Sequence, residues 1–151
     1  MDERDYPKGI DCVWIGADRN GRLGVFVTGG EGPIPALALR SDRTPVEDIE
    51  SLLLQLPSST SSRLVIPLKR PDDFMELAQR GFFAYDWSDI HRTRNEATGG
   101  YELIAVPEVP LVRGEVPSAI ASLVEGLELN VDFAVAGEVD AGKEVQCRTP
   151  N

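Results

Sequence analysis

Hydrophobic and polar positions alternate most regularly over residues 10–35, and this pattern predicts a β-hairpin. Residues 13–17 and 23–27 each alternate with a period of two, on either side of a polar turn at 18–21. Both faces of these strands are largely apolar, with Trp14 and Phe26 on one face and aliphatic side chains on the other. Strands of this kind need cover on both faces, so we expect the hairpin to lie inside the fold.

Three further segments have the apolar spacing of amphipathic helices. The first is expected over 45–56, where Thr44 and Glu47 have the spacing of a capping box. The second is expected over 72–80, because two aspartates stand at its positive end and a glycine follows it. The third is expected to open at Pro117, since proline is favoured at the first helical position.

Short β-branched and aromatic runs predict the remaining strands. They lie at 36–39, 63–66, 82–85, 101–106 and 131–135. The order strand, helix, strand over 63–85 suggests a parallel βαβ unit, and 101–106 is expected to return beside 82–87.

The predicted fold is α/β in the α+β sense, a single domain with a mostly antiparallel sheet. We expect about five or six strands with about three helices packed on them. The globular domain is expected over 1–136. Residues 137–151 show no lasting period of 2 or 3.6, which predicts an acidic C-terminal tail that is exposed or forms a weak edge strand.

Charge is the strongest signal in the composition. The chain has 25 acidic and 15 basic residues, a net charge of −10 at neutral pH, and residues 101–151 carry nine acidic against three basic residues. Such a charge repels phosphate backbones and anionic membranes, so nucleic acid and membranes are not expected partners. A net negative surface also serves solubility alone.

The cysteines and the hydropathy pattern bear on the compartment. Cys12 and Cys147 are the only cysteines, too few for a disulfide framework, and reduced thiols favour a cytoplasmic location. The N-terminal residues lack an apolar run, and nowhere do about 18 apolar residues follow one another. We therefore expect neither export nor a membrane span.

Motifs for catalysis, metals or cofactors are weak. The glycine-rich bend at 29–35 lacks the Gly-Lys-Ser/Thr ending of a phosphate loop and carries Glu31, so a structural turn or a partner-contacting loop is expected. Asp18 and Asn20 imitate the start of a calcium loop, but apolar residues follow where ligands would be needed. His91 is the only histidine and favours neither a zinc site nor a catalytic triad. No cofactor, metal or catalytic residue is predicted.

The most informative polar cluster is Asp86, Trp87, Ser88 and Asp89. An indole between two carboxylates can anchor a cationic side chain of a partner, because aromatic anchors dominate interface energetics. Two alternatives stay open, a strand end with Trp87 simply packed and a paired-carboxylate acid/base site. The predicted partner-binding residues are Glu31, Asp86, Trp87 and Asp89.

Several segments together resemble small bacterial immunity-type proteins of polymorphic toxin systems. The resemblance is carried by Val13-Trp14-Ile15-Gly16 with Asp18, Phe26-Val27-Thr28-Gly29-Gly30 with Gly32-Pro33-Ile34-Pro35, Arg80-Gly81-Phe82-Phe83-Ala84-Tyr85-Asp86-Trp87, and Tyr101-Glu102-Leu103-Ile104-Ala105-Val106-Pro107. It implies a cytoplasmic protein without cofactors that binds a cognate toxin and blocks its active site.

Three functional hypotheses follow. The first is a non-enzymatic binding protein, an immunity protein whose acidic surface meets a basic toxin domain, present as a monomer or homodimer. The second is a small enzyme or ligand-binding domain with a pocket near 29–35 and 86–91. The third is a structural subunit that self-assembles through its two-sided apolar hairpin.

Overall fold

The computed structural model describes residues 2–68, 70–87 and 100–150. Its strands are β1 (Val13–Ala17), β2 (Leu23–Val27), β3 (Ile34–Pro35), β4 (Ser62–Leu64), β5 (Phe83–Asp86), β6 (Gly100–Pro107), β7 (Glu138–Asp140) and β8 (Cys147–Arg148). Its helices are α1 (Val46–Leu53), α2 (Asp72–Ala78), α4 (Ser118–Ala121) and α5 (Ala141–Glu144), with 3-10 helices η1 (Ala36–Leu39), η3 (Arg113–Glu115) and η4 (Ser122–Val124).

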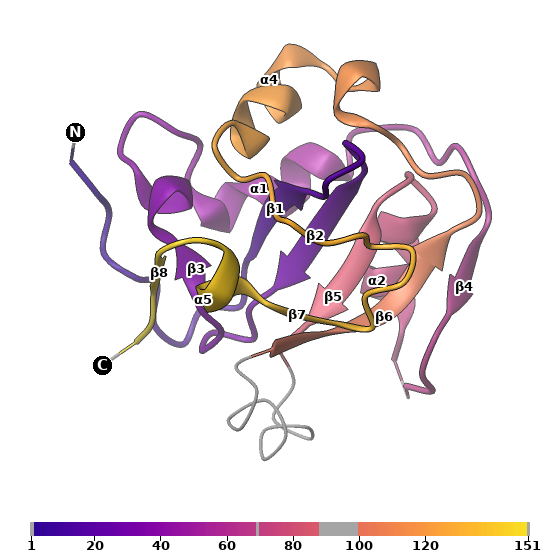
Figure 1. The fold of residues 1–151 in the computed structure, drawn as a ribbon, viewed down its shortest axis with the longest axis horizontal. Coiled ribbons are helices and arrows are strands. Elements are labelled where there is room, and N and C mark those ends of the chain that lie inside the picture. Colours follow the sequence, from indigo (N-terminus) through magenta and orange to yellow (C-terminus); the bar gives the residue numbers. More distant parts are fainter. Residues whose placement is uncertain (1, 69, 88–99, 151) are drawn as a thin grey trace.

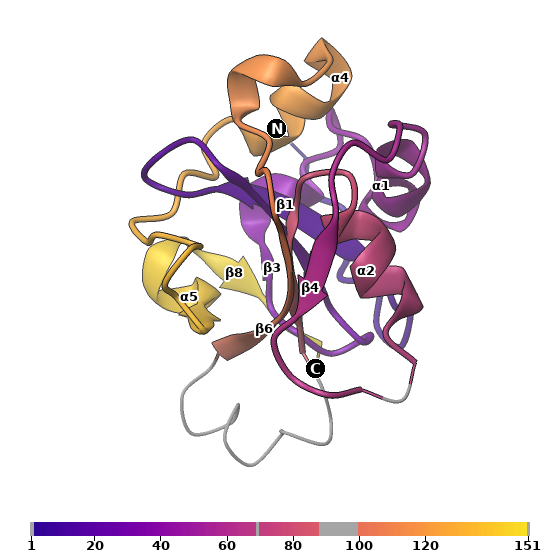
Figure 2. The ribbon, with the colours of Figure 1, turned by 90° about the vertical axis from the view of Figure 1, so that its right-hand side faces the viewer.

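One main sheet organises the chain (Figure 1). Within the described residues it has six strands, in the order β1-β2-β5-β6-β4 with β7 also pairing β6, while β3 and β8 form a separate two-stranded sheet. Only β2 and β5 pair in parallel within the main sheet; its other pairs are antiparallel. Helices α1 and α2 lie on one face, opposite β8 and α5 (Figure 2). The predicted class, a single α+β domain with a mostly antiparallel sheet, is confirmed.

The β1–β2 hairpin forms as predicted and is buried on both faces. Trp14 and Phe26 are directly opposite in register, and their rings stack with centroids 4.1 Å apart. The aliphatic positions Val13, Ile15 and Val25 are at most 1% exposed. Gly21 closes the turn with φ 80°, a left-handed conformation that glycine adopts without strain. Because the chain covers its own hairpin, these faces are not open to a second copy.

Helix α1 keeps its predicted apolar stripe but not its predicted cap. Val46, Ile49 and Leu53 are buried, as the spacing requires. The N-cap position is Pro45 in an extended conformation, with no side-chain hydrogen bond to the first turn. The capping box from Thr44 is therefore wrong, because the helix begins one residue later than that box requires.

Strands β4 and β5 run parallel, as the predicted βαβ unit requires, because each is antiparallel to β6; the direct pairing of the two strands is wrong, since β6 lies between them. Strand β4 pairs with β6 in antiparallel fashion, and β5 lies between β2 and β6. Both edges of β5 are thus taken, one by β2 in parallel and one by β6 in antiparallel register. The prediction that 101–106 pairs with 82–87 is confirmed by β6.

Two other strand predictions are wrong. Residues 36–39 form η1, because the neighbouring β3 pairs with β8 and the chain then turns. Residues 131–135 form a loop. Phe133 N donates to the Asp18 carboxylate, Ala134 N donates to the Asp132 carboxylate, and Val135 N donates to the backbone carbonyl of Asp132. The helix predicted from Pro117 is split into α4 and η4, although Ile120, Leu123 and Val124 are buried as its stripe predicted.

The segment after 136 has more structure than its aperiodic pattern suggested. It forms β7, α5 and β8, and Val139 and Ala141 are each at most 1% exposed. Strand β7 pairs with β6, and β8 pairs with β3. In these pairs the partner residues are 36 to 114 positions apart in the sequence, so no local periodicity reveals them.

Candidate functional site

Three of the four predicted partner-binding residues lie at one end of the main sheet. Asp86 is the last residue of β5 and is half-buried, Trp87 follows it, and Glu31 is exposed on the bend after β2. Asp86 is opposite Val27, the residue from which the bend starts. The fourth residue, Asp89, lies outside the described residues, as do Ser88 and His91.

Trp87 joins the strand end to the glycine bend. Its backbone N–H donates to Val27 O at 2.9 Å, and its ring lies edge-on to Tyr101 with centroids 5.5 Å apart. A Cβ at Gly32 would come within 2.9 Å of Trp87, so this glycine permits the close approach. Trp87 therefore packs directly against the glycine bend. Residues 88–91, which belong to the predicted pocket, lie outside the described residues.

The Tyr101 hydroxyl is hydrogen-bonded to the glycine-rich bend at residues 29–35. This hydroxyl accepts a hydrogen bond from Trp14 Nε1 at 3.2 Å and donates one to Pro33 O at 2.7 Å. Complete burial raises the pKa of Tyr101 well above its ordinary value. Its phenol therefore stays protonated and acts as a structural donor, not as an acid or base.

Strand register places three carboxylates side by side at this sheet end. Asp86 is directly opposite Glu102, and Glu102 is directly opposite Glu138. We call these three residues the acidic ladder. No spacing in the sequence could have revealed it, because it depends on the β5–β6–β7 pairing.

A second group of carboxylates covers the outer side of α1 and α2. We call Asp11, Glu47, Glu50, Asp73 and Glu76 the acidic face. Burial of the Glu50 carboxyl, and then the negative charges of Asp73, Asp11 and Glu76, raise the pKa of Glu50. Asp11, Glu47, Asp73 and Glu76 are exposed, and Glu50 is half-buried between them. The face thus gathers charge from three separate segments of the chain.

Asp11 connects the acidic face to the sheet end. Its Oδ1 accepts a hydrogen bond from Gly29 N at 2.9 Å, and a Cβ at Gly29 would lie 2.9 Å from Trp87 O. The same carboxylate helps to raise the pKa of Glu50. The acidic face, the glycine bend with Glu31, and Trp87 are therefore contiguous. The sequence analysis recognised Glu31 and Trp87 but missed the helix acids, whose signal was their placement on the polar side of both helices.

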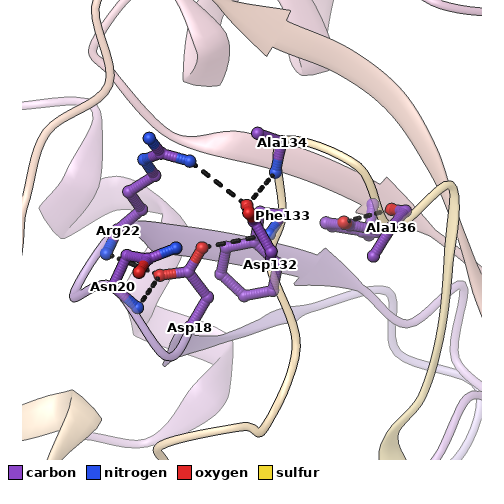
Figure 3. A network of polar contacts seen from close by, with 8 residues as sticks. Asp18, Asn20, Arg22, Asp132, Phe133, Ala134 and Ala136 are labelled. Carbon is purple, nitrogen blue, oxygen red and sulfur yellow. Dashed lines mark hydrogen bonds and ion pairs between the residues drawn. The ribbon is translucent and has the colours of Figure 1, made fainter.

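A third carboxylate network is structural (Figure 3). Asp18 is 2% exposed, and its Oδ1 accepts from the backbone N–H groups of Asn20 and Arg22, each at 2.9 Å. Its Oδ2 accepts from Phe133 N at 3.0 Å. Both oxygens are used by the protein itself, so Asp18 stabilises the hairpin turn and does not resemble a calcium ligand.

Across residues 2–68, 70–87 and 100–150, no three His, Cys, Asp or Glu side chains converge as they would around a metal ion. In the same part of the chain, every helix is too short or too polar to cross a bilayer.

Comparisons with known proteins leave the family open. No protein-family model, curated protein or solved structure matches the chain.

Proposed function

We propose that this protein is a non-enzymatic binding protein that docks a basic protein partner on its acidic face. In the reading we favour it is a cytoplasmic immunity protein, and the partner is a toxin domain whose active site it occludes. The observation that carries the proposal is the environment of Glu50, which is half-buried among Asp11, Asp73 and Glu76.

The energetics of this cluster support a role in binding. A carboxyl whose pKa is raised by burial and by neighbouring negative charges, as that of Glu50 is, reduces the stability of the fold at neutral pH. Departures of this kind from local consistency concentrate at functional sites. A basic partner would relieve the repulsion between Glu50 and the neighbouring carboxylates. Removing this destabilisation of the free protein would contribute to the binding free energy. The negative electrostatic potential of the acidic face would also speed diffusional encounter with a cationic protein.

The sheet end supplies the aromatic side of the proposed interface. We propose that Glu31, Asp86 and Trp87 border the acidic face and contact the same partner, and that Asp89 belongs to the same set of contacts. Trp87 is half-buried, and its indole is fixed against Tyr101. A rigid aromatic that loses little entropy on binding is the usual anchor of an interface.

The test is binding to toxin-like domains encoded next to this chain. A variant with Glu47→Gln, Glu50→Gln, Asp73→Asn and Glu76→Gln removes four negative charges from the acidic face. We expect the association rate constant to fall about tenfold or more at low salt, and its dependence on salt to flatten. Surface plasmon resonance at two salt concentrations measures both effects.

A matched control removes four negative charges elsewhere. Asp2→Asn, Glu108→Gln, Glu125→Gln and Glu128→Gln change exposed residues that belong to neither α1 nor α2. We expect this variant to bind with nearly the wild-type rate constant and to neutralise the toxin fully. Equal losses in the two variants would mean that only total charge matters. No binding to any neighbouring toxin-like domain would contradict the proposal.

A further inference from the structure

A pocket of about 410 Å³ lies on the side of the molecule that holds both chain ends. It is formed by the N-terminal segment, β3 with η1, and the chain around β8, which meet near the two-stranded sheet (Figure 1). Apolar side chains make up much of its wall, and they are Pro35, Ala36, Leu37, Leu127 and Val145. This volume and lining are typical of sites for small molecules.

Two arginines also line this pocket, although the whole chain carries a net charge of −10. Arg148 donates from Nε and Nη2 to Glu3, at 2.8 and 3.2 Å. Arg40 donates from Nε and Nη2 to Asp42, at 3.1 and 2.8 Å.

These ion pairs orient the guanidinium groups but occupy only some of their N–H donors. A guanidinium has five N–H donors in a planar fork, and a bidentate carboxylate occupies two of them. The side chains of Arg40 and Arg148 are 35% and 40% exposed, so neither guanidinium is sealed off by its ion pair. Arg40 also lines a neighbouring pocket with Asp42 and Arg43, so it stands between the two pockets. Glu3 also lines the pocket and competes for Arg148.

We propose that this pocket binds a small organic carboxylate with an apolar body. The carboxylate accepts hydrogen bonds from Arg40 and Arg148, and the apolar body lies against Leu37, Leu127 and Val145. The acidic face belongs to other segments of the chain, so this site and the proposed partner surface can be tested separately.

The probe is octanoate, with 1-octanol as its uncharged counterpart of similar apolar length. Titration into ¹⁵N-labelled protein is followed by amide chemical shifts. We expect octanoate to shift the amides of Leu37, Leu127 and Val145 with a dissociation constant of about 1 mM or below. We expect 1-octanol to bind at least about fivefold more weakly, because it cannot form charge-assisted bonds.

Three variants assign the charge. Arg40→Gln and Arg148→Gln are each expected to weaken octanoate binding about fivefold or more. Glu3→Gln is expected to strengthen it, because Arg148 then loses its competing carboxylate. Arg63→Gln, which changes an exposed arginine on β4, serves as the matched control and should leave binding unchanged.

Several results would overturn the proposal. These are no shift at the pocket amides with octanoate up to about 10 mM, equal affinity for octanoate and 1-octanol, or unchanged affinity in folded Arg40→Gln and Arg148→Gln. The dispersion of the same spectra shows whether each variant is folded. If both arginine variants unfold, the comparison of octanoate with 1-octanol in the wild-type protein decides.

Discussion

The backbone N–H of Phe133 donates a hydrogen bond to Oδ2 of Asp18 at 3.0 Å, across 115 residues of sequence. The other oxygen of this buried carboxylate closes the β1–β2 turn through Asn20 and Arg22. One side chain therefore stabilises both the hairpin and the loop that covers it.

Replacing Asp18 should be among the most damaging single changes in this chain. Asp18→Ala leaves three backbone N–H groups without their acceptor at a buried site, and we expect a loss of about 2–4 kcal/mol in the free energy of unfolding. Asp18→Asn keeps one acceptor oxygen and should lose less. Urea denaturation measures both. Asp5→Ala, at an exposed position, should stay within about 0.5 kcal/mol of wild type.

Gly24 is predicted to tolerate no side chain, because Phe133 occupies the space above it. A Cβ at Gly24 would lie 2.8 Å from the Phe133 ring, which is fully buried. We expect Gly24→Ala to destabilise the protein by about 1–3 kcal/mol through overpacking. In a Phe133→Leu background the same change should cost less, since the ring is absent.

Gly114 offers the control for this substitution. A Cβ there meets nothing within 4 Å. Gly114→Ala should therefore leave the free energy of unfolding nearly unchanged. If Gly24→Ala behaves like Gly114→Ala in thermal melts, the Phe133 contact does not limit this position.

Glu50 should make stability fall as the pH rises. Its folded-state pKa is raised by burial first and by Asp73, Asp11 and Glu76 next, so the folded chain holds this proton more tightly than the unfolded chain. Stability is then lost as the pH rises from the unfolded pKa through the folded one. After allowance for solvent screening, we expect Glu50→Gln to stabilise the protein by about 0.5 kcal/mol at neutral pH.

The pH series separates this effect from a general effect of charge removal. The gain from Glu50→Gln should vanish below the ordinary glutamate pKa, where the wild-type carboxyl is also protonated. Glu128→Gln removes the ion pair with Arg113 at 3.0 Å and should give no gain. A Glu50→Gln variant less stable than wild type at neutral pH would show that the carboxylate is well compensated.

Both thiols should react slowly with thiol reagents at neutral pH. Burial and then the negative charge of Asp140 raise the pKa of Cys147 to about 11, and burial is the largest cause of the raised pKa of Cys12. Only the thiolate attacks, so the labelling rate of Cys147 should rise about tenfold per pH unit below its pKa.

Single Cys12→Ser and Cys147→Ser variants assign the two rates in a chromogenic disulfide assay. Unfolding in urea should accelerate both reactions, because it removes the burial. Labelling of the folded chain at pH 7 as fast as that of the unfolded chain would contradict these thiol environments.

Much of the fold was predictable because its signals are local. The alternation around Trp14 and Phe26 required burial on both faces, and the stripe Val46, Ile49, Leu53 required a covered helix. Turn residues such as Gly21 supplied the chain reversal. Local patterns gave the wrong prediction where contacts between distant segments determine the backbone structure. Examples are the loop around Phe133 and the elements after residue 136.

The residues of the candidate surface also fall into two groups, those that the sequence indicates and those that only the tertiary structure brings together. Trp87 and Glu31 could be selected from sequence because an aromatic beside acids and a charge in a glycine bend are conspicuous. The acidic face could not, because Asp11, Glu50 and Asp73 come from three segments, and only packing brings their charges within range of one another.

By itself the sequence determined the class of fold, the buried hairpin, the helix stripes and an excess of negative charge, since each depends on residue type and short-range spacing. Tertiary structure alone decided which strands are neighbours, where the carboxylates gather, and that two arginines line an apolar pocket. The physical reason is that strand register and helix packing are set by contacts between distant segments, and these contacts determine which charges lie within a few ångströms of one another.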